Sequence, residues 1–195
     1  MTIRIAQFLA GSLLLLSATT LSTHSSAQGL AQVNFNAAES CSALSDLVIK
    51  DTHITLAEIV DQDSFIVPGM DNAMRTPAFC RLAGVTKPAV NFEVWLPLTE
   101  WNGNYQSVGN GGMAGTISYA AMANALRRSY ATASTDTGHK AGPIPFDAFW
   151  ASGRPDLIED FGHRALHLTT VNAKQVTCLL YTSDAADDLL CVDLG

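Results

Sequence analysis

The chain has 195 residues and carries 11 Lys and Arg against 18 Asp and Glu, a formal net charge of −7. Apart from the Arg127-Arg128 pair its cations are scattered singly, whereas a protein that binds phosphate backbones needs a basic stripe to displace counterions. Nucleic acid is therefore excluded as a partner, and the length suits one ordinary domain without internal repeats.

Residues 1–27 have the layout of a secretory signal peptide. One cation, Arg4, precedes an apolar stretch at residues 9–16, and small residues close the segment at Ser25-Ser26-Ala27. A membrane anchor is the alternative, but Gly11 and its polar neighbours interrupt the run well short of the roughly 20 residues that a spanning helix needs. We expect a secreted or periplasmic protein with no membrane partner.

Whether Cys41 and Cys80 form a disulfide depends on the compartment in which the protein folds. Oxidising surroundings let disulfides form and persist, so we expect these two residues to be bonded. Closing a loop of about 40 residues removes unfolded-state entropy worth about 4 kcal/mol in the chain-entropy model. Two buried free thiols are the alternative.

Short strands and loops are expected between the two cysteines. Alternating runs occur at residues 47–49, 53–56 and 64–67, with a turn at Pro68-Gly69. His53 lies in one of these runs without a partner His or Cys at metal spacing, so it is interpreted as an ordinary strand residue.

The clearest strand signal lies at residues 91–97, which alternate and are rich in β-formers. Residues 101–104 predict a turn, because their Asn-Gly pair tolerates positive φ, and residues 105–108 predict the next strand. The two strands are expected to pair as a hairpin. The second runs directly into residues 109–115, which we call the glycine loop.

A helix is predicted after the glycine loop, at residues 119–126, where apolar residues recur at helical spacing. Ser118 is a candidate cap, and Arg127-Arg128 fall in the last turn, where cations favour the helix dipole. Residues 130–135 then predict a small-residue strand, and residues 136–139 predict the turn that leaves it.

A second helix is expected after a long proline-containing loop, with Asp160 as its cap. Its apolar face is marked by Leu166, Thr169, Ala173 and Val176. The order is therefore strand, glycine-rich loop, helix, strand, loop, helix, which is an α/β pattern. It matches the front half of an α/β-hydrolase sheet, where such a loop supplies an oxyanion N–H and the nucleophile elbow follows the next helix. We predict a partial α/β-hydrolase fold over residues 28–177, without that elbow.

The glycine loop has two competing chemical interpretations. A nucleotide-binding loop is disfavoured, because the loop lacks a Gly-Lys-Ser/Thr ending and a Gly-x-Gly-x-x-Gly with an acidic residue at the usual distance. Glycines can instead bring backbone N–H groups close to a substrate carbonyl, and Gly111 and Gly112 are the candidates for an oxyanion hole. A purely structural tight turn remains the alternative for any one glycine.

Other side chains that suggest chemistry are interpreted as structural. His163 and His167 lie one helical turn apart, but the residue after the first is Arg164 rather than a Glu, and no third zinc ligand follows. No serine has a Gly-x-Ser-x-Gly setting, and Ser134 is interpreted as core packing. Asp136 and His139 are interpreted as local turn chemistry. No metal site and no cofactor are expected in this chain.

Residues 178–195 differ in character from what precedes them. The segment contains four acidic residues and no cation, and it resembles translated adapter or vector sequence. A genuine acidic amphipathic end is the alternative. We expect the segment to be non-native and to pack poorly, so that Cys178 and Cys191 give no information on disulfides.

Several ordered motifs between Cys41 and Val176 are similar to the tannase and feruloyl esterase family. They are Cys80-Arg81, Asn91 to Pro97, Trp101-Asn102-Gly103, Gly109 to Gly112 with Ala114-Gly115, Tyr130 to His139, Asp160 to Gly162 and Arg164 to His167. The resemblance implies an α/β-hydrolase domain with a lid inserted later in the chain, and a structural calcium ion in that lid.

The resemblance also implies the chemistry. Members use a Ser-Asp-His triad in which the Ser follows a Cys and the His precedes one, with a disulfide tying the two together. Their substrates are aromatic carboxylic esters of galloyl or feruloyl type, and a branch hydrolyses a terephthalate monoester. This chain lacks all three triad residues and the lid, so we expect it to be a fragment that is inactive by itself. A secreted, non-catalytic module that binds carbohydrate or phenolic compounds is the alternative.

Overall fold

The computed structural model describes residues 37–113, 115–142, 144 and 146–181. The predicted signal peptide and residues 182–195 of the predicted non-native tail lie outside these residues. Within the described part, no helix is long and apolar enough to cross a membrane.

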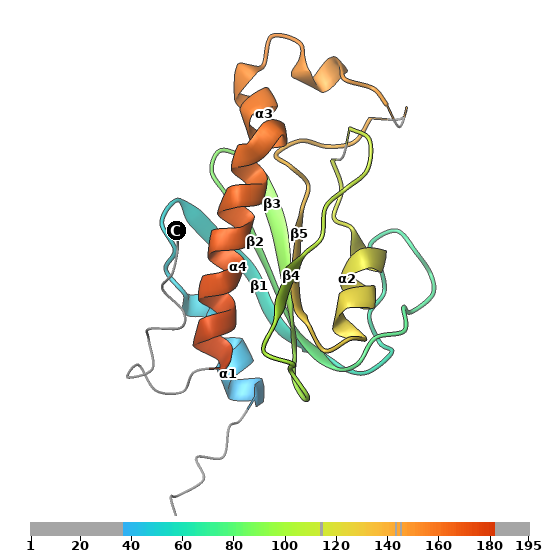
Figure 1. Ribbon diagram of the computed structural model, residues 1–195, viewed down its shortest axis with the longest axis vertical. Coiled ribbons are helices and arrows are strands. Elements are labelled where there is room, and N and C mark those ends of the chain that lie inside the picture. Colours follow the sequence, from blue (N-terminus) through green and yellow to red (C-terminus); the bar gives the residue numbers. More distant parts are fainter. Residues whose placement is uncertain (1–36, 114, 143, 145, 182–195) are drawn as a thin grey trace, which may run out of the picture. The chain divides into compact units, whose positions relative to one another are not determined.

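A five-stranded mixed sheet forms the centre of the fold (Figure 1). Its strands in chain order are β1 (Thr52–Val60), β2 (Phe79–Thr86), β3 (Val90–Pro97), β4 (Tyr105–Ser107) and β5 (Ala131–Thr135). Their spatial order is β1-β2-β3-β5-β4, and every neighbouring pair is antiparallel except β4 and β5, which are parallel. The fold class is thus α/β, as predicted.

Helices cover both faces of this sheet. The helices in chain order are α1 (Ala37–Ala43), α2 (Tyr119–Leu126), α3 (Pro155–Glu159) and α4 (Ala165–Tyr181). Short 3-10 turns lie at Leu44–Asp46 and Phe149–Ala151, and a π-helical turn at Asp160–Arg164 joins α3 to α4. Both α2 and α4 pack on β3 and β5, and α1 packs on β1 and β2.

Two hydrophobic clusters form the core, one on each face. Strand residues alternate between the faces, so Val94 and Leu96 of β3 join the cluster beneath α4, while Trp95 joins the cluster beneath α2. Trp95 is fully buried there, 4.5 Å from the ring of Phe79 and 4.7 Å from that of Phe65. The alternation seen in the sequence is thus used on both sides, as in a three-layer α/β fold.

The predicted hairpin is wrong. Residues 91–97 and 105–107 do form strands, but β5 lies between them: β3 pairs with β5, and β5 pairs with β4. A turn at Gly103, with φ of 78°, is present as predicted. A local turn only redirects the chain. All five residues of β5 are buried, and this burial favours a place for β5 between β3 and β4 over the edge of the sheet.

Strand β2 was missed, and the predicted run at residues 64–67 is a loop with a single bridge from Ile66 to Ala73. The β2 signal is hidden by Arg81 and Gly84. Gly84 is needed because a Cβ at this position would come within 2.8 Å of the Phe92 ring on β3. Position 84 is therefore a glycine instead of a residue with high β-propensity, because the Phe92 ring packs directly against its backbone.

The two predicted helix caps are also wrong. Ser118 precedes α2 but makes no capping bond, and Asp160 lies inside a continuous helical segment that begins at Pro155. Proline at the first position starts a helix well because its φ is already helical. Of the predicted face of the last helix, Thr169, Ala173 and Val176 are buried and Leu166 is exposed.

Helix α4 continues past the position where the tail was predicted to begin. Leu180 is fully buried, and the Tyr181 hydroxyl donates to the Pro97 carbonyl at 2.7 Å. The Tyr181 ring stacks on Trp101 with centroids 4.0 Å apart, and burial raises the pKa of its hydroxyl. The prediction that the segment from Cys178 onward packs poorly is therefore wrong for residues 178–181.

Candidate functional site

The glycine loop lies where two parallel strands end. It connects β4 to α2, and β4 is hydrogen-bonded to β5, so the carboxyl ends of both strands meet at the same edge of the sheet. The Val108 N–H continues the ladder by donating to the Ala133 carbonyl at 2.9 Å. In open α/β sheets, ligands bind outside the carboxyl ends of the strands. The loop is therefore placed where a substrate would be expected.

Asn110 fixes the first part of the loop. Its amide donates to the Thr135 carbonyl at the end of β5 at 2.7 Å, and its Oδ1 accepts from the Ser118 hydroxyl at 2.6 Å. The same hydroxyl lies 3.0 Å from the Gly109 carbonyl. One side chain thus connects the loop to β5 and to the start of α2.

Contacts from the segment after β5 fix the last part of the loop. His139 is buried, and its Nε2 lies 2.6 Å from the Met113 carbonyl oxygen. The Ala141 N–H donates to the Gly115 carbonyl at 3.1 Å. Gly115 has φ of 84°, and a Cβ on it would come within 2.3 Å of the Ala141 nitrogen. Only glycine fits this position without moving the backbone.

Gly111 and Gly112, the predicted oxyanion-hole candidates, lie between these two sets of contacts. Both are exposed, and within the described residues neither N–H donates to a protein acceptor. A Cβ at Gly111 would meet nothing within 4 Å, and Gly112 has φ of 59°. Among the described residues, no hydrogen bond therefore engages these two N–H groups. Their role in an oxyanion hole stays a prediction.

The turn after β5 is organised by Asp136. This buried carboxylate accepts from the Asn91 N–H at 3.0 Å, from the Asn91 amide at 2.6 Å and from the Gly138 N–H at 3.0 Å, and it pairs with Lys140 at 3.1 Å. Its role is structural but goes beyond the predicted local turn chemistry, because Asn91 lies 45 residues earlier in the chain. His139 is more than local turn chemistry, because its partner lies 26 residues earlier in the chain.

Ser134 is buried in β5, as predicted, and its hydroxyl oxygen accepts the Ser118 N–H at 3.0 Å. It holds the start of α2 and lies within a regular strand. A nucleophilic serine needs an exposed, strained turn with a general base in reach. Ser134 has none of these features.

Asp160 is a buried carboxylate that lies directly under this turn. A Cβ on Gly138 would come within 2.8 Å of its Oδ2, and Arg164 forms an ion pair with its Oδ1. Within the described part of the chain neither oxygen accepts a hydrogen bond of good geometry. Burial raises the pKa of Asp160, and the Arg164 charge opposes the rise without cancelling it. His163 and His167 are exposed on the same helical segment.

A charged network on the other face of the sheet was missed in the sequence. Arg81 donates to Glu93 through Nε at 2.9 Å and Nη2 at 2.7 Å, and the Trp95 Nε1–H and Tyr119 hydroxyl also donate to Glu93 at 2.8 and 3.0 Å. Burial lowers the pKa of Arg81, but its bonds to Glu93 outweigh this and leave it raised. A Glu inside an apolar strand was the available signal. Because Tyr119 begins α2, this network fixes the helix that follows the glycine loop.

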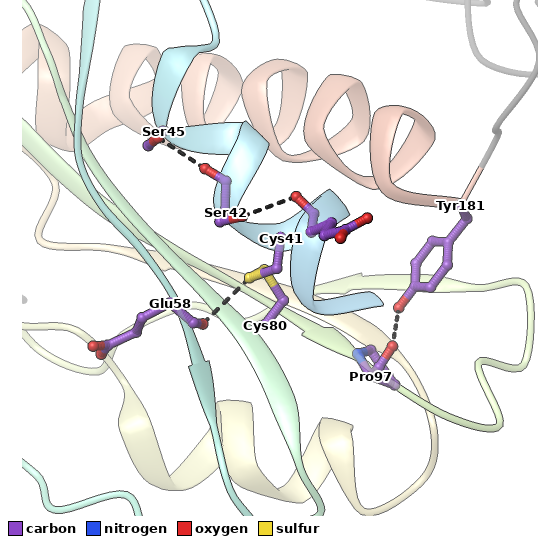
Figure 2. Close-up of a disulfide and its surroundings, with 8 residues drawn as sticks. Cys41, Ser42, Ser45, Glu58, Cys80, Pro97 and Tyr181 are labelled. Atoms are coloured by element: carbon purple, nitrogen blue, oxygen red, sulfur yellow. Dashed lines mark hydrogen bonds between the residues drawn. A yellow bond between two sulfur atoms is a disulfide. The ribbon is translucent and has the colours of Figure 1, made fainter. Parts of the chain in front are cut away.

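The predicted disulfide between Cys41 and Cys80 is confirmed, with Cα atoms 5.8 Å apart (Figure 2). It joins α1 to β2, the second strand in the sheet, and both residues are completely buried. The bond therefore closes the N-terminal part of the described chain over the cluster beneath α4.

The described residues include no cluster of metal ligands. His, Cys, Asp and Glu side chains form no group of three there that could hold an ion. The calcium ion implied by the family resemblance would belong to the lid.

Several known proteins are similar to this chain in sequence and in fold. The family model described as tannase and feruloyl esterase matches residues 72–187, which is more than half of the chain. An uncharacterized esterase of Xanthomonas campestris pv. campestris is 42% identical over 143 residues, 71% of this chain and 24% of that protein. Probable feruloyl esterase B-1 of Aspergillus fumigatus is 38% identical over 114 residues, 56% of this chain and 21% of that protein.

The crystal structure of feruloyl esterase B from Aspergillus oryzae superposes with a TM-score of 0.65 at 26% identity, covering 74% of this chain and 30% of that one. The chain spans about a quarter of the length of the first two relatives. The family match includes the glycine loop, the turn after β5 and α4. On these grounds the chain belongs to the tannase and feruloyl esterase family.

Proposed function

We propose that this chain supplies the oxyanion-binding loop of a secreted serine hydrolase that cleaves aromatic carboxylic esters of galloyl or feruloyl type. Family membership points to carboxylic ester hydrolysis. The observation that carries the more specific proposal is the pair of exposed glycines, Gly111 and Gly112, in the loop at the carboxyl ends of β4 and β5.

The chemistry follows from where charge develops. When a nucleophile attacks an ester carbonyl, the carbonyl oxygen becomes an oxyanion, and donors already oriented toward it stabilise the transition state more than the substrate. Removing one such donor costs roughly 100- to 1000-fold in kcat. Gly111 and Gly112 would contribute this stabilisation, while activation of the nucleophile needs residues that this chain does not provide.

The sheet topology supports a position for those residues. Among the described strands, β4 has a neighbour on one side only. A parallel strand after α4 would reach the free edge of β4 by a right-handed crossover. Its carboxyl end would then lie beside the glycine loop, where a serine on a strained elbow would face the two N–H groups. We propose that the whole protein continues in this way.

Secretion is supported by the sequence of residues 1–27 and by the buried disulfide, because disulfides persist in oxidising compartments. By itself, the chain is expected to be inactive: without an activated serine there is no acyl-enzyme, and donors alone leave a small fraction of the full acceleration.

The test is to read the source DNA beyond the codon for Tyr181, where α4 ends, and to express the complete open reading frame. We expect an in-frame Gly-Cys-Ser-x-Gly-Gly and hydrolysis of methyl ferulate or methyl gallate, with no hydrolysis by the 195-residue chain. A stop codon at that point, together with binding of phenolic compounds or carbohydrate but no turnover, would favour a non-catalytic module.

A further inference from the structure

The glycine loop faces a physical difficulty if it is to act on an oxyanion. Glycine loses more conformational freedom on folding than any other residue, and four of the residues from 109 to 115 are glycine. Yet donors accelerate a reaction only when they are oriented in advance, because reorientation during the reaction consumes the gain. Something outside the glycines must therefore hold the loop.

Asn110 provides a restraint immediately before Gly111. Its side chain is engaged at both ends, by the Thr135 carbonyl and by the Ser118 hydroxyl, at 2.7 and 2.6 Å. These two partners belong to different elements, since Thr135 ends β5 and Ser118 precedes α2. The first end of the loop is thus tied to the two rigid elements on either side of it.

His139 provides a restraint immediately after Gly112. A carbonyl oxygen only accepts, so the 2.6 Å contact to Met113 requires the hydrogen on Nε2 of His139. The ring itself is held by stacking on Trp150 at 3.9 Å and by an edge contact with Phe161 at 5.8 Å. A buried, stacked imidazole is a rigid donor, so the Met113 carbonyl has a fixed position.

We infer that Asn110 and His139 are positioning residues that hold Gly111 and Gly112 from both sides, so that their N–H groups keep one orientation. The inference deepens the proposed function and rests on the oxyanion role assigned there. Neither side chain touches the reacting atoms. Both act through the backbone, at the residue before and the residue after the glycine pair.

The experiment uses ¹⁵N relaxation of this chain, without substrate. In the unaltered chain, the order parameters of the Gly111 and Gly112 amides should be near the rigid value of about 0.85. Asn110→Asp keeps the shape but removes the donor to Thr135, and His139→Leu removes the donor to Met113. Either change should lower both order parameters below about 0.6, with α4 amides unchanged. His167→Leu, at an exposed histidine, is the matched control and should change neither glycine.

A second measurement does not depend on a variant that folds. The ¹⁵N shifts of the His139 ring report which nitrogen carries hydrogen, and we expect a protonated Nε2. An Nε2 without hydrogen would overturn the inference, because the bond to Met113 would not exist. Unchanged order parameters at both glycines in either folded variant would overturn it as well.

Kinetics of the complete protein separate positioning from general stability. His139→Leu should lower kcat on methyl ferulate about tenfold or more with KM within about twofold, because displacement of oriented groups reduces turnover. His139→Gln should restore most of the loss, since its amide nitrogen reaches the place of Nε2. If the complete protein hydrolyses no ester while the order parameters fall as expected, the proposed function fails and the two anchors stand. If the complete protein hydrolyses esters but the order parameters in the variants are unchanged, the positioning role of Asn110 and His139 fails and the proposed function stands.

Discussion

Among single residues, the buried carboxylates Glu93 and Asp160 differ in the number of hydrogen bonds and ion pairs that compensate their burial. Glu93 has four donors from three side chains around it. Asp160 has one ion pair and, within the described residues, no hydrogen bond of good geometry. Burial of a charge is tolerated when it is paired and bonded, and it shifts the pKa when it is not.

Glu93→Gln should destabilise the fold by about 3 kcal/mol, because breaking the buried pair leaves Arg81 with only its half-exposed ion pair to Glu58. Urea unfolding measures the loss. The matched control is Asp156→Asn, which breaks the exposed ion pair with Arg154 and should cause no resolvable change. Equal effects of the two substitutions would show that the Glu93 network contributes nothing specific.

Asp160 should make the protein more stable at low pH, whereas a carboxylate with a lowered pKa makes a protein more stable at high pH. Its pKa is raised by burial, so the folded state binds the proton more tightly than the unfolded chain. The free energy of unfolding should therefore fall as pH rises from the unfolded value of 3.8 through the raised folded pKa. Compared with Asp160→Asn, the unaltered chain should gain stability between pH 7 and pH 4. A difference that shrinks on acidification would show that the Arg164 ion pair dominates instead.

At the scale of elements, the disulfide decides whether α1 stays on the sheet (Figure 2). Replacing Cys41 and Cys80 together by Ser should lower the free energy of unfolding by about 4 kcal/mol, because the bond spans 39 residues and restricts the unfolded chain. Thermal unfolding of the unaltered chain and of the double variant, both without reductant, measures the loss, because a reductant would also reduce the disulfide of Cys178. Identical midpoints for the two proteins would mean that the Cys41–Cys80 bond does not stabilise the fold.

The glycine loop offers a matched pair of substitutions. Gly115→Ala should destabilise the protein by about 1–3 kcal/mol, because its φ of 84° is strained for alanine and a Cβ would strike the Ala141 nitrogen. Gly111→Ala should stay within about 0.5 kcal/mol, because nothing lies within 4 Å of the added carbon. Chemical denaturation of both variants checks this, and the reverse order would contradict the described loop.

At the scale of the whole molecule, local sequence signals predicted most elements but not their arrangement. Strands β3, β4 and β5, helix α2 and the disulfide followed from alternation, helical spacing and the expected compartment. The position of β5 between β3 and β4 did not, because pairing depends on which strand is buried from both faces. The Glu93 network, the Asn110 contacts and the reach of His139 to Met113 were missed for a related reason. They join residues that are distant in sequence, and no local pattern reports such contacts.

Whether Gly111 and Gly112 form part of an oxyanion hole can be measured through kcat of the complete protein on methyl ferulate. Gly111→Val is the cleaner variant, because its Cβ meets nothing within 4 Å, whereas Gly112 has a positive φ of 59°. We expect kcat to fall about 100-fold or more while the fold is retained, because the side chain would keep the ester oxygen from the N–H. An unchanged kcat for both Gly111→Val and a folded Gly112→Val would contradict the account and leave these glycines as turn formers only.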